Sequence, residues 1–343
     1  MGGIRASIVG SLPKPAAMAE PERLFAPWRE SGAALAAAQD AAVVHWLDAQ
    51  AAAGLHIVTD GEQRRRHYIW GWLEGLTGID TETLGSKASR GGRYQKETAV
   101  ARIVGEVAWR SPVLGDAVRF ARGHTKQILK VTLPGPMTTA DSVLDVAGRR
   151  SDADLAMMFA ELLNREAIAL VDAGADVVQF DEPCFNIYVD QVKDWGIATL
   201  ERAMRDVKAT RAVHICYGYG VPRVLDWKTQ NRDWGHYGRT LPLLAKSSVD
   251  QISIETAASG VDVSVIEAAR GKDILLGVID VGTRNVETAA AVADRLRRAL
   301  AFVAPQRLIG CTDCGMVPLP EAIALAKMHA LGAGVARLNA EIA

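Results

Sequence analysis

Short runs of apolar residues, rich in Val and Ile, recur along the chain and are separated by longer segments with helical patterning. Most of these runs are apolar nearly throughout, which is typical of strands that are buried on both faces of a parallel sheet. The runs predict eight strands, at Ile4–Gly10, Leu55–Thr59, Ile128–Leu133, Asp176–Phe180, Ala212–Ile215, Val249–Ile254, Ile274–Ile279 and Arg307–Ile309.

Segments with helical patterning connect the expected strands. They are Leu35–Ala53, Asp152–Ala173, Trp195–Ala209, Val286–Val303 and Leu319–Leu331. Three of them are followed by a glycine (Gly54, Gly174 and Gly332), the residue that most often ends a helix. Eight strands alternating with helices predict an α/β fold, the (β/α)₈ TIM barrel. The alternative is an open doubly wound sheet, but the Gly-x-Gly-x-x-Gly fingerprint of many such sheets is missing after the first strand.

One connection of the expected barrel is much longer than the others. The second strand ends near Asp60 and the third begins near Ile128. We therefore expect one catalytic domain over residues 1–343, with an insertion at about 63–126 that acts as a lid or a docking hairpin. Gly91-Gly92 and the partly alternating Thr98–Val107 predict the hairpin.

The insertion is also basic, and its basic residues are Arg64, Arg65, Arg66, Lys87, Arg90, Arg93, Lys96 and Arg102. Such a run is consistent with a solvated face, or with a surface that meets an acidic methyl donor or a partner protein. His67, which follows three arginines, is expected at the surface.

Composition narrows the function classes. Hydrophobic residues make up 49% of the chain and charged residues 23%, and the net charge is −1. This balance permits a large core and gives no indication of nucleic acid or a membrane surface as a partner. No apolar stretch reaches the length of a membrane span, and the first residues lack a signal peptide's apolar segment. Four cysteines are too few for a disulfide scaffold, so a cytoplasmic location is expected.

Polar and reactive residues follow nearly every expected strand at the same end. In a TIM barrel, the chemistry lies at the C-terminal ends of the strands. The residues in question are Ser11, Glu62, Asp181, His214, Cys216, Glu255, Asp280 and Cys314. Chance would distribute such residues over both ends of the strands, so this pattern predicts an active site.

A metal site is the first candidate within this set. His214 and Cys216 are two positions apart at a strand end and therefore share a face. Glu255 and Cys314 can converge on the same axis, and His, Cys, Cys and a carboxylate are suitable ligands for Zn²⁺. Zinc with two thiolate ligands is suited to binding a third thiol and deprotonating it.

Two other interpretations of these residues stay open. His214 can be a buried core histidine, and the thiols can be unrelated core residues. The role of Cys311 is also open, because Cys311-x-x-Cys314 can be half of a zinc ribbon or a redox pair, although no second Cys-x-x-Cys is present.

Seven motifs, in this order, are similar to the catalytic barrel of cobalamin-independent methionine synthase. They are Val9-Gly10-Ser11, Thr59-Asp60-Gly61-Glu62, Leu133-Pro134-Gly135-Pro136-Met137-Thr138, Gln179-Phe180-Asp181-Glu182-Pro183, His214-Ile215-Cys216-Tyr217, Ser253-Ile254-Glu255 and Asp313-Cys314-Gly315. The resemblance implies zinc held by the ligands His214, Cys216, Glu255 and Cys314.

The same resemblance implies an amino-acid substrate. Ser11 would contact the carboxylate of homocysteine, and Glu62 and Asp181 would hold its amino group, which suits their charge. Without the family, Glu62 and Asp181 read as an acid/base pair, and both are candidate catalytic residues.

The sequence departs from the family pattern in three places, all of which concern the methyl donor. We expect the large N-terminal half of the full-length synthase to be missing. The family's folate-binding tryptophan is replaced within Thr138-Thr139-Ala140-Asp141, and its strand-seven histidine is missing from Asp280-Val281-Gly282-Thr283. We therefore expect a folate-independent form that methylates homocysteine to methionine, with a corrinoid or a partner protein supplying the methyl group.

Three rival functions share parts of this pattern. An epoxyalkane:coenzyme M transferase would bind a sulfonate, which a basic residue such as Lys14, Arg64 or Arg284 near the site would favour. A relative of porphyrinogen decarboxylase would have the barrel and need no zinc. A non-catalytic zinc- or corrinoid-binding accessory protein would leave the amino-acid motifs without a role.

Overall fold

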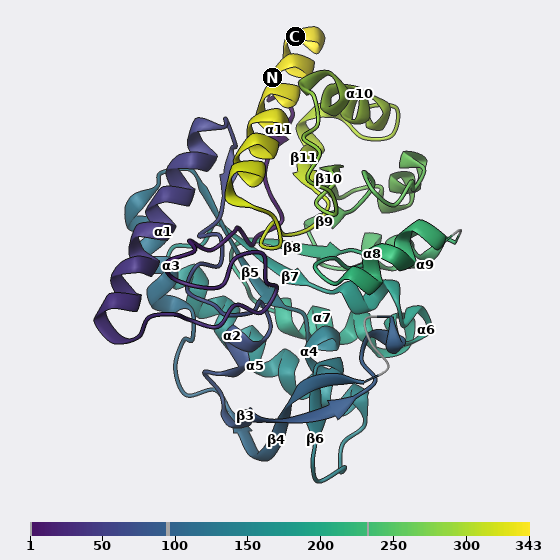
Figure 1. The fold of residues 1–343 in the computed structure, drawn as a ribbon. Helices are drawn as coiled ribbons and strands as arrows, with labels where there is room; N and C mark the ends of the chain where they lie inside the picture. Colours follow the sequence, from purple (N-terminus) through teal and green to yellow (C-terminus); the bar gives the residue numbers. More distant parts are fainter. Residues whose placement is uncertain (1, 94–96, 232) are drawn as a thin grey trace.

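Eight parallel strands form the central sheet of the protein. The structure is a computed structural model that describes residues 2–93, 97–231 and 233–343. The strands follow the order β1-β11-β10-β9-β8-β7-β5-β2. Their bounds are β1 Arg5–Ala6, β2 Ile57–Val58, β5 Ile128–Pro134, β7 Val177–Asp181, β8 Thr210–Ile215, β9 Gln251–Ile254, β10 Asp273–Ile279 and β11 Leu308–Thr312. The N–H of His56 donates to the Ala6 carbonyl over 2.9 Å, so the edge strands β1 and β2 meet and the sheet nearly closes (Figure 1).

Helices surround this sheet and cover its outer face (Figure 1). The longer ones are α1 Gly32–Ala52, α3 Gly115–His124, α5 Asp152–Asp172, α7 Ile197–Met204, α8 Pro222–Gln230, α9 His236–Ala245, α10 Ala289–Ala299 and α11 Glu321–Ile342. Shorter helices are α2 Trp70–Leu73, α4 Pro136–Asp141 and α6 Val189–Gln191. The expected TIM barrel is confirmed, because each predicted strand contains or overlaps an observed one. None of the described helices combines the length and apolar character that crossing a membrane requires.

The glycines that follow the predicted helices do not all end them. Gly54 and Gly174 have positive φ angles of 77° and 110°, and each lies just beyond the helix, as expected. The predicted end at Leu331 is wrong, because α11 continues through Gly332 to Ile342. A Cβ atom on Gly332 would lie 1.7 Å from the Ala53 carbonyl oxygen, so this glycine permits close packing of α11 against the end of α1.

The insertion folds into a small second sheet beside the barrel (Figure 1). Strands β3 (Thr77–Lys87) and β4 (Thr98–Ala108) form an antiparallel hairpin, and β6 (Val143–Asp145) pairs in parallel with β4. Because β6 follows barrel strand β5 and helix α4, the hairpin is joined to the barrel by backbone pairing. The partly alternating segment Thr98–Val107 lies in β4, the second strand of this hairpin. Lys96 lies outside the described residues.

The basic residues of the insertion mostly have partners within the protein. Arg64 pairs with Asp40, Arg66 with Glu74 and Arg102 with Asp80. Arg65 is buried and donates to the Thr132 carbonyl, and the buried Arg90 pairs with Asp141. These five residues therefore join the insertion to itself and to the barrel, which differs from a simple solvated face.

Candidate active site

A cavity of about 520 Å³ opens at the C-terminal ends of the barrel strands. Six of the seven predicted site residues line it, namely Ser11, Glu62, Asp181, His214, Cys216 and Cys314. The hairpin supplies part of the opposite wall, through Leu84, Arg90 and Val100. The structure therefore brings residues from several barrel strand ends and from the insertion around one space.

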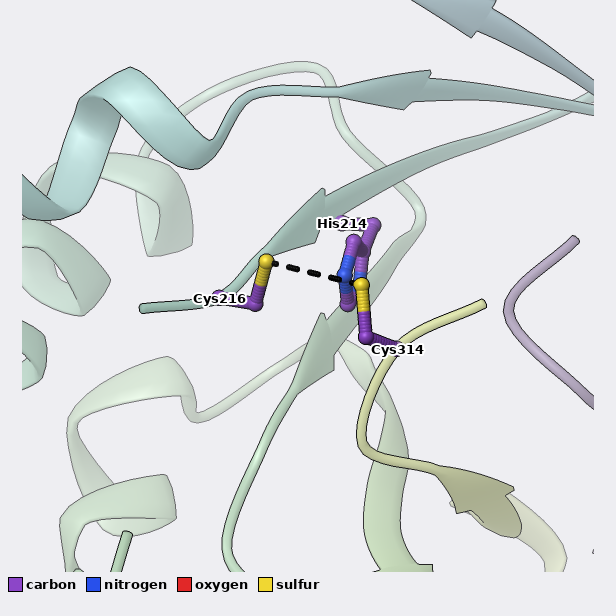
Figure 2. A group of neighbouring side chains, drawn as sticks. All are labelled: His214, Cys216 and Cys314. Atoms are coloured by element: carbon purple, nitrogen blue, oxygen red, sulfur yellow. Dashed lines mark hydrogen bonds between the residues drawn. The ribbon is translucent and has the colours of Figure 1, made fainter. Parts of the chain in front are cut away.

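Three of the predicted metal ligands form a compact group. His214 lies on β8 and Cys216 follows that strand, whereas Cys314 lies on the loop after β11 (Figure 2). One ligand atom from each residue lies within 4.8 Å of the others. The two sulfur atoms are 3.9 Å apart. A disulfide requires about 2.05 Å, so both residues are free thiols.

The residues in this group fit Zn²⁺. Two Zn–S bonds of about 2.3 Å at a tetrahedral angle place their sulfurs roughly 3.8 Å apart, close to the separation observed here. His214 uses Nδ1 for a 2.9 Å hydrogen bond with the Ser253 hydroxyl. Its Nε2 is buried and has no hydrogen-bond partner in the described part of the chain. An imidazole oriented through one nitrogen, with the other unpaired, is the usual arrangement of a metal-binding histidine.

The predicted fourth ligand, Glu255, is bound elsewhere. Both of its carboxylate oxygens accept hydrogen bonds from Lys228 Nζ, at 2.8 and 2.9 Å, and one also accepts from the Tyr217 N–H at 2.8 Å. Glu255 is fully buried, which raises its pKa to about 8. It follows β9, next to the strand that carries His214, but the compact group of ligand atoms does not include it.

Asp313 fixes the backbone next to Cys314 and next to Glu255. Its carboxylate accepts hydrogen bonds from the N–H groups of Thr256, Ala257 and Ala258, at 2.8–3.0 Å. It also accepts a hydrogen bond from the Tyr219 hydroxyl at 3.0 Å. Since Asp313 precedes Cys314 and the three amides follow Glu255, this one side chain ties the ends of β11 and β9 together.

Ser11 lies in the segment that follows β1, beside the loop after β11. Its carbonyl accepts the Met316 N–H at 2.7 Å. A Cβ atom on Gly315 would lie 2.0 Å from the Ser11 hydroxyl, so a glycine is required at that position. Ser11 is therefore adjacent in space to the residue that follows Cys314.

Glu62 adopts a backbone conformation that is unusual for a residue with a side chain. Its φ angle is 57°, and non-glycine residues in this region are uncommon and often functional. The turn is fixed by the Asp60 carboxylate, which accepts the Glu62 N–H at 3.0 Å. One carboxylate oxygen of Glu62 accepts a 2.8 Å hydrogen bond from the Thr132 hydroxyl. A Cβ atom on Gly10 would lie 2.9 Å from this oxygen, so the bare glycine leaves room for the carboxylate.

Asp181 and its neighbour Glu182 have different surroundings. Asp181 lines the cavity and accepts a 2.8 Å hydrogen bond from Gln179, and burial raises its pKa to about 7. Glu182 is turned away and accepts hydrogen bonds from the N–H groups of Met137 and Thr138 at the start of α4. Asp181 is thus available to a ligand, whereas Glu182 holds the turn after β5.

The cavity is also lined by residues to which the sequence pattern gave no part in binding homocysteine or a metal. Lys14 and His67 line the cavity, together with Arg90. The prediction of a surface position for His67 is wrong, because this half-buried imidazole faces the cavity and burial lowers its pKa to about 3. Lys14 lies three residues after Ser11, and this proximity to a strand end was the one available signal.

The remaining cysteine ambiguity concerns Cys311. This residue is fully buried on β11 and packs with Val9, Ile57, Leu275 and Ile309. It is absent from the compact group of ligand atoms, and burial raises the pKa of its thiol. Cys311 is therefore placed as a core residue of the barrel.

Comparisons with known proteins agree with this geometry. The family described as "Cobalamin-independent synthase, Catalytic domain" matches residues 4–334. A methionine synthase of Sulfurisphaera tokodaii is 30% identical over 323 residues, which cover 94% of this chain and 88% of that protein.

Solved structures give the same result. A B12-independent methionine synthase from Shewanella sp. W3-18-1, in complex with selenomethionine, superposes with a TM-score of 0.95 and 42% identity over 99% of both chains. The vitamin-B12 independent methionine synthase proposed for Listeria monocytogenes has a TM-score of 0.68 at 19% identity, over 100% of this chain and 99% of that one, and shows the shared fold. The chain therefore belongs to the cobalamin-independent methionine synthase family, through its catalytic domain.

Proposed function

We propose that this protein is a zinc-dependent methyltransferase that alkylates the thiolate of homocysteine to give methionine. The observation that carries the proposal is the content of a single cavity. It combines a His-Cys-Cys group that fits a thiol-binding metal with two buried carboxylates that fit an amino group.

His214, Cys216 and Cys314 would hold the zinc ion, and Glu255 would complete the site once its carboxylate leaves Lys228. When bound, Zn²⁺ would keep the homocysteine sulfur deprotonated, as a thiolate, near neutral pH. The methylation then forms a bond between that sulfur and the methyl carbon as the bond from the methyl carbon to the donor breaks. The donor leaves with that electron pair.

The chain's own residues would orient the amino acid. Glu62 and Asp181 both line the cavity, and the Glu62 charge raises the pKa of Asp181 in addition to the effect of burial. A substrate ammonium group placed between them relieves this repulsion and forms charge-assisted hydrogen bonds. Ser11, in the segment that follows β1, would contact the carboxylate.

The methyl donor would be something other than free methyltetrahydrofolate. The segment Thr138-Thr139-Ala140-Asp141 stands where the family has a folate-binding tryptophan, and the Thr138 hydroxyl is used in a 2.7 Å hydrogen bond to Glu182. The segment after β10 begins with Asp280 and lacks the family's histidine. The Asp280 carboxylate accepts a hydrogen bond from the Gly282 N–H at 2.7 Å. A corrinoid or a partner protein remains our candidate, and the hairpin side of the cavity is where it would meet the sulfur.

One assay tests the thiol and the donor together. Zinc-loaded protein is incubated with homocysteine and either methylcobalamin or methyltetrahydrofolate, and methionine is measured by mass spectrometry. We expect methionine from the corrinoid and none above background from the folate. Brisk methionine formation from free methylfolate would overturn the donor assignment, and failure to bind homocysteine would overturn the function.

A coenzyme M transferase is the second candidate, and Lys14 is the observation that favours it. Of the three basic residues considered, Lys14 lines the cavity, whereas Arg64 pairs with Asp40 and Arg284 with Glu22. Glu62 and Asp181 oppose this function because carboxylates repel a sulfonate. Calorimetric titration with coenzyme M and with homocysteine separates the two, and we expect heat of binding from homocysteine alone.

A further inference from the structure

Lys14 is a buried cation that has no assigned role. Its side chain lines the cavity, and the residue is only 6% exposed. Within the described residues its ammonium group has no hydrogen bond or ion pair, and it lies 5.9 Å from the centre of the Trp28 ring. Burying an ammonium group without a partner is costly, so a site that keeps one is prepared for an anion.

The backbone around Lys14 is held rigidly. Gln63 donates to the carbonyls of Leu12 and Pro13, at 3.1 and 3.3 Å, and the Trp46 indole donates to the Pro13 carbonyl at 2.9 Å. Pro13 and Pro15 flank the lysine and restrict the backbone on both sides. The ammonium group is therefore positioned by a built segment, in contrast to a lysine on a mobile surface loop.

The charged residues around Lys14 do not neutralise its ammonium group. Glu62 and Asp60 attract the ammonium group and Arg65 repels it, but neither carboxylate lies within ion-pair distance. Asp60 lies 3.9 Å from Arg65, and Glu62 accepts the Thr132 hydroxyl. Burial still lowers the pKa of Lys14 to about 8, which indicates that these neighbours do not fully compensate the buried charge.

We infer that Lys14 binds the α-carboxylate of the amino-acid substrate and selects thiols that carry one. This inference rests on the proposed function, because it takes Glu62 and Asp181 as the residues that hold the amino group. In an α-amino acid the ammonium and carboxylate groups share one carbon, so their binding groups must be neighbours. Lys14 is near Glu62 and lies three residues after Ser11, which offers only a neutral hydroxyl.

Calorimetry with the intact protein and three ligands tests the inference. The ligands are methionine, methylthiopropylamine (the same molecule without the carboxylate) and methylthiobutanoate (the same molecule without the amino group). The variants are Lys14→Met, Lys14→Arg and Lys272→Met as a control. Lys272 precedes β10 at the opposite end of the barrel, where it donates to the Ser247 carbonyl.

In the wild-type protein we expect methionine to bind more tightly than methylthiopropylamine. Lys14→Met should weaken methionine binding roughly 10- to 100-fold, the range of a charge-assisted hydrogen bond, and leave methylthiopropylamine within about threefold. Lys14→Arg should retain the preference for the carboxylate, and Lys272→Met should match the wild type.

Two results would overturn the inference while leaving the proposed function intact. One is an equal loss of affinity for methionine and methylthiopropylamine in Lys14→Met, which would indicate a structural role. The other is unchanged methionine binding in that variant, which would assign Lys14 to an anionic group of the methyl donor. If wild-type protein binds neither methionine nor homocysteine, the proposed function itself fails.

Discussion

The sulfur atoms of Cys216 and Cys314 lie 3.9 Å apart, although 98 positions separate the two residues in the chain. The hydrogen bond from the Cys314 thiol lowers the pKa of Cys216 well below its usual range. The two sulfurs lie next to the unpaired Nε2 of His214, so the three side chains are arranged to take a metal ion with little rearrangement.

This pair predicts the effect of removing one sulfur. Cys314→Ser should lower the zinc content of the purified protein from about one equivalent to a small fraction, because a hydroxyl is a much poorer zinc ligand than a thiolate. Elemental analysis after gel filtration measures this. Cys311→Ser is the matched control, since Cys311 packs in the barrel core, and it should keep its zinc. Equal zinc in the wild type and in Cys314→Ser would rule out the site.

Lys228→Met tests whether Glu255 can reach the metal. Removing the ammonium group leaves a buried carboxylate without its partner, which should cost about 3–5 kcal/mol of unfolding free energy in metal-free protein. In zinc-loaded protein the loss should be smaller, because the ion can take the Glu255 oxygen. Urea unfolding with and without zinc measures both values. An identical loss in the two forms would argue against Glu255 as a ligand.

Glu62→Gln should separate recognition of the amino group from recognition of the rest of the ligand. Losing the carboxylate charge should weaken methionine binding about 10- to 100-fold. Methylthiobutanoate, which has no amino group, should bind equally well or better, because a repelling charge is gone. Calorimetry measures both affinities, and a parallel loss for the two ligands would contradict the assignment.

The lowered pKa of Lys14, about 8, predicts how ligand binding depends on pH. The protonated amine binds a carboxylate, so the contribution of Lys14 to methionine affinity should be constant below about pH 8 and should fall as the pH rises further. Glu62, Asp60 and Arg65 also face this amine, and His67, with a pKa near 3, stays neutral over this range. In Lys14→Arg the guanidinium keeps its charge over this pH range. The ratio of the methionine affinity of the wild type to that of Lys14→Arg therefore reports the titration of Lys14 alone. A ratio independent of pH between 7 and 9.5 would contradict the prediction.

Gly332→Ala should destabilise the protein although alanine normally favours a helix. The added Cβ would clash with the Ala53 carbonyl oxygen, so we expect a loss of about 2 kcal/mol or more. A methyl group on Gly238 in α9 would meet no atom of another element within 4 Å, so this glycine serves as the control. Gly238→Ala should gain roughly 0.5–1 kcal/mol. Thermal unfolding of both variants provides the comparison.

The barrel could be predicted because its strands are buried on both faces and therefore appear as continuous apolar runs. The proximity of His214 and Cys216 could be predicted from the alternation of side chains along β8, which places both residues on one face. The end of α11 could not be predicted, because a packing glycine and a terminating glycine look identical in a sequence. Gly332 is the first kind and Gly174 the second.

The ion-pair partners of individual charged residues could not be predicted from the sequence. Glu255 binds Lys228, which lies 27 positions away on α8, and no periodicity connects them. Lys14 stands between two prolines near a strand end, but only the folded chain shows that it is buried without an ion pair to the residues described. The cytoplasmic location stays a prediction.

The wall that the hairpin adds to the cavity has an evolutionary consequence. Leu84, Arg90 and Val100 belong to a segment inserted between two strands, whereas the sulfur and carboxylate groups sit on the strand ends themselves. Insertions and deletions within that one loop can reshape the space for a second reactant and leave the amino-acid end unaltered. Lineages that share this barrel can therefore exchange one co-substrate for another without rebuilding the groups on the strand ends.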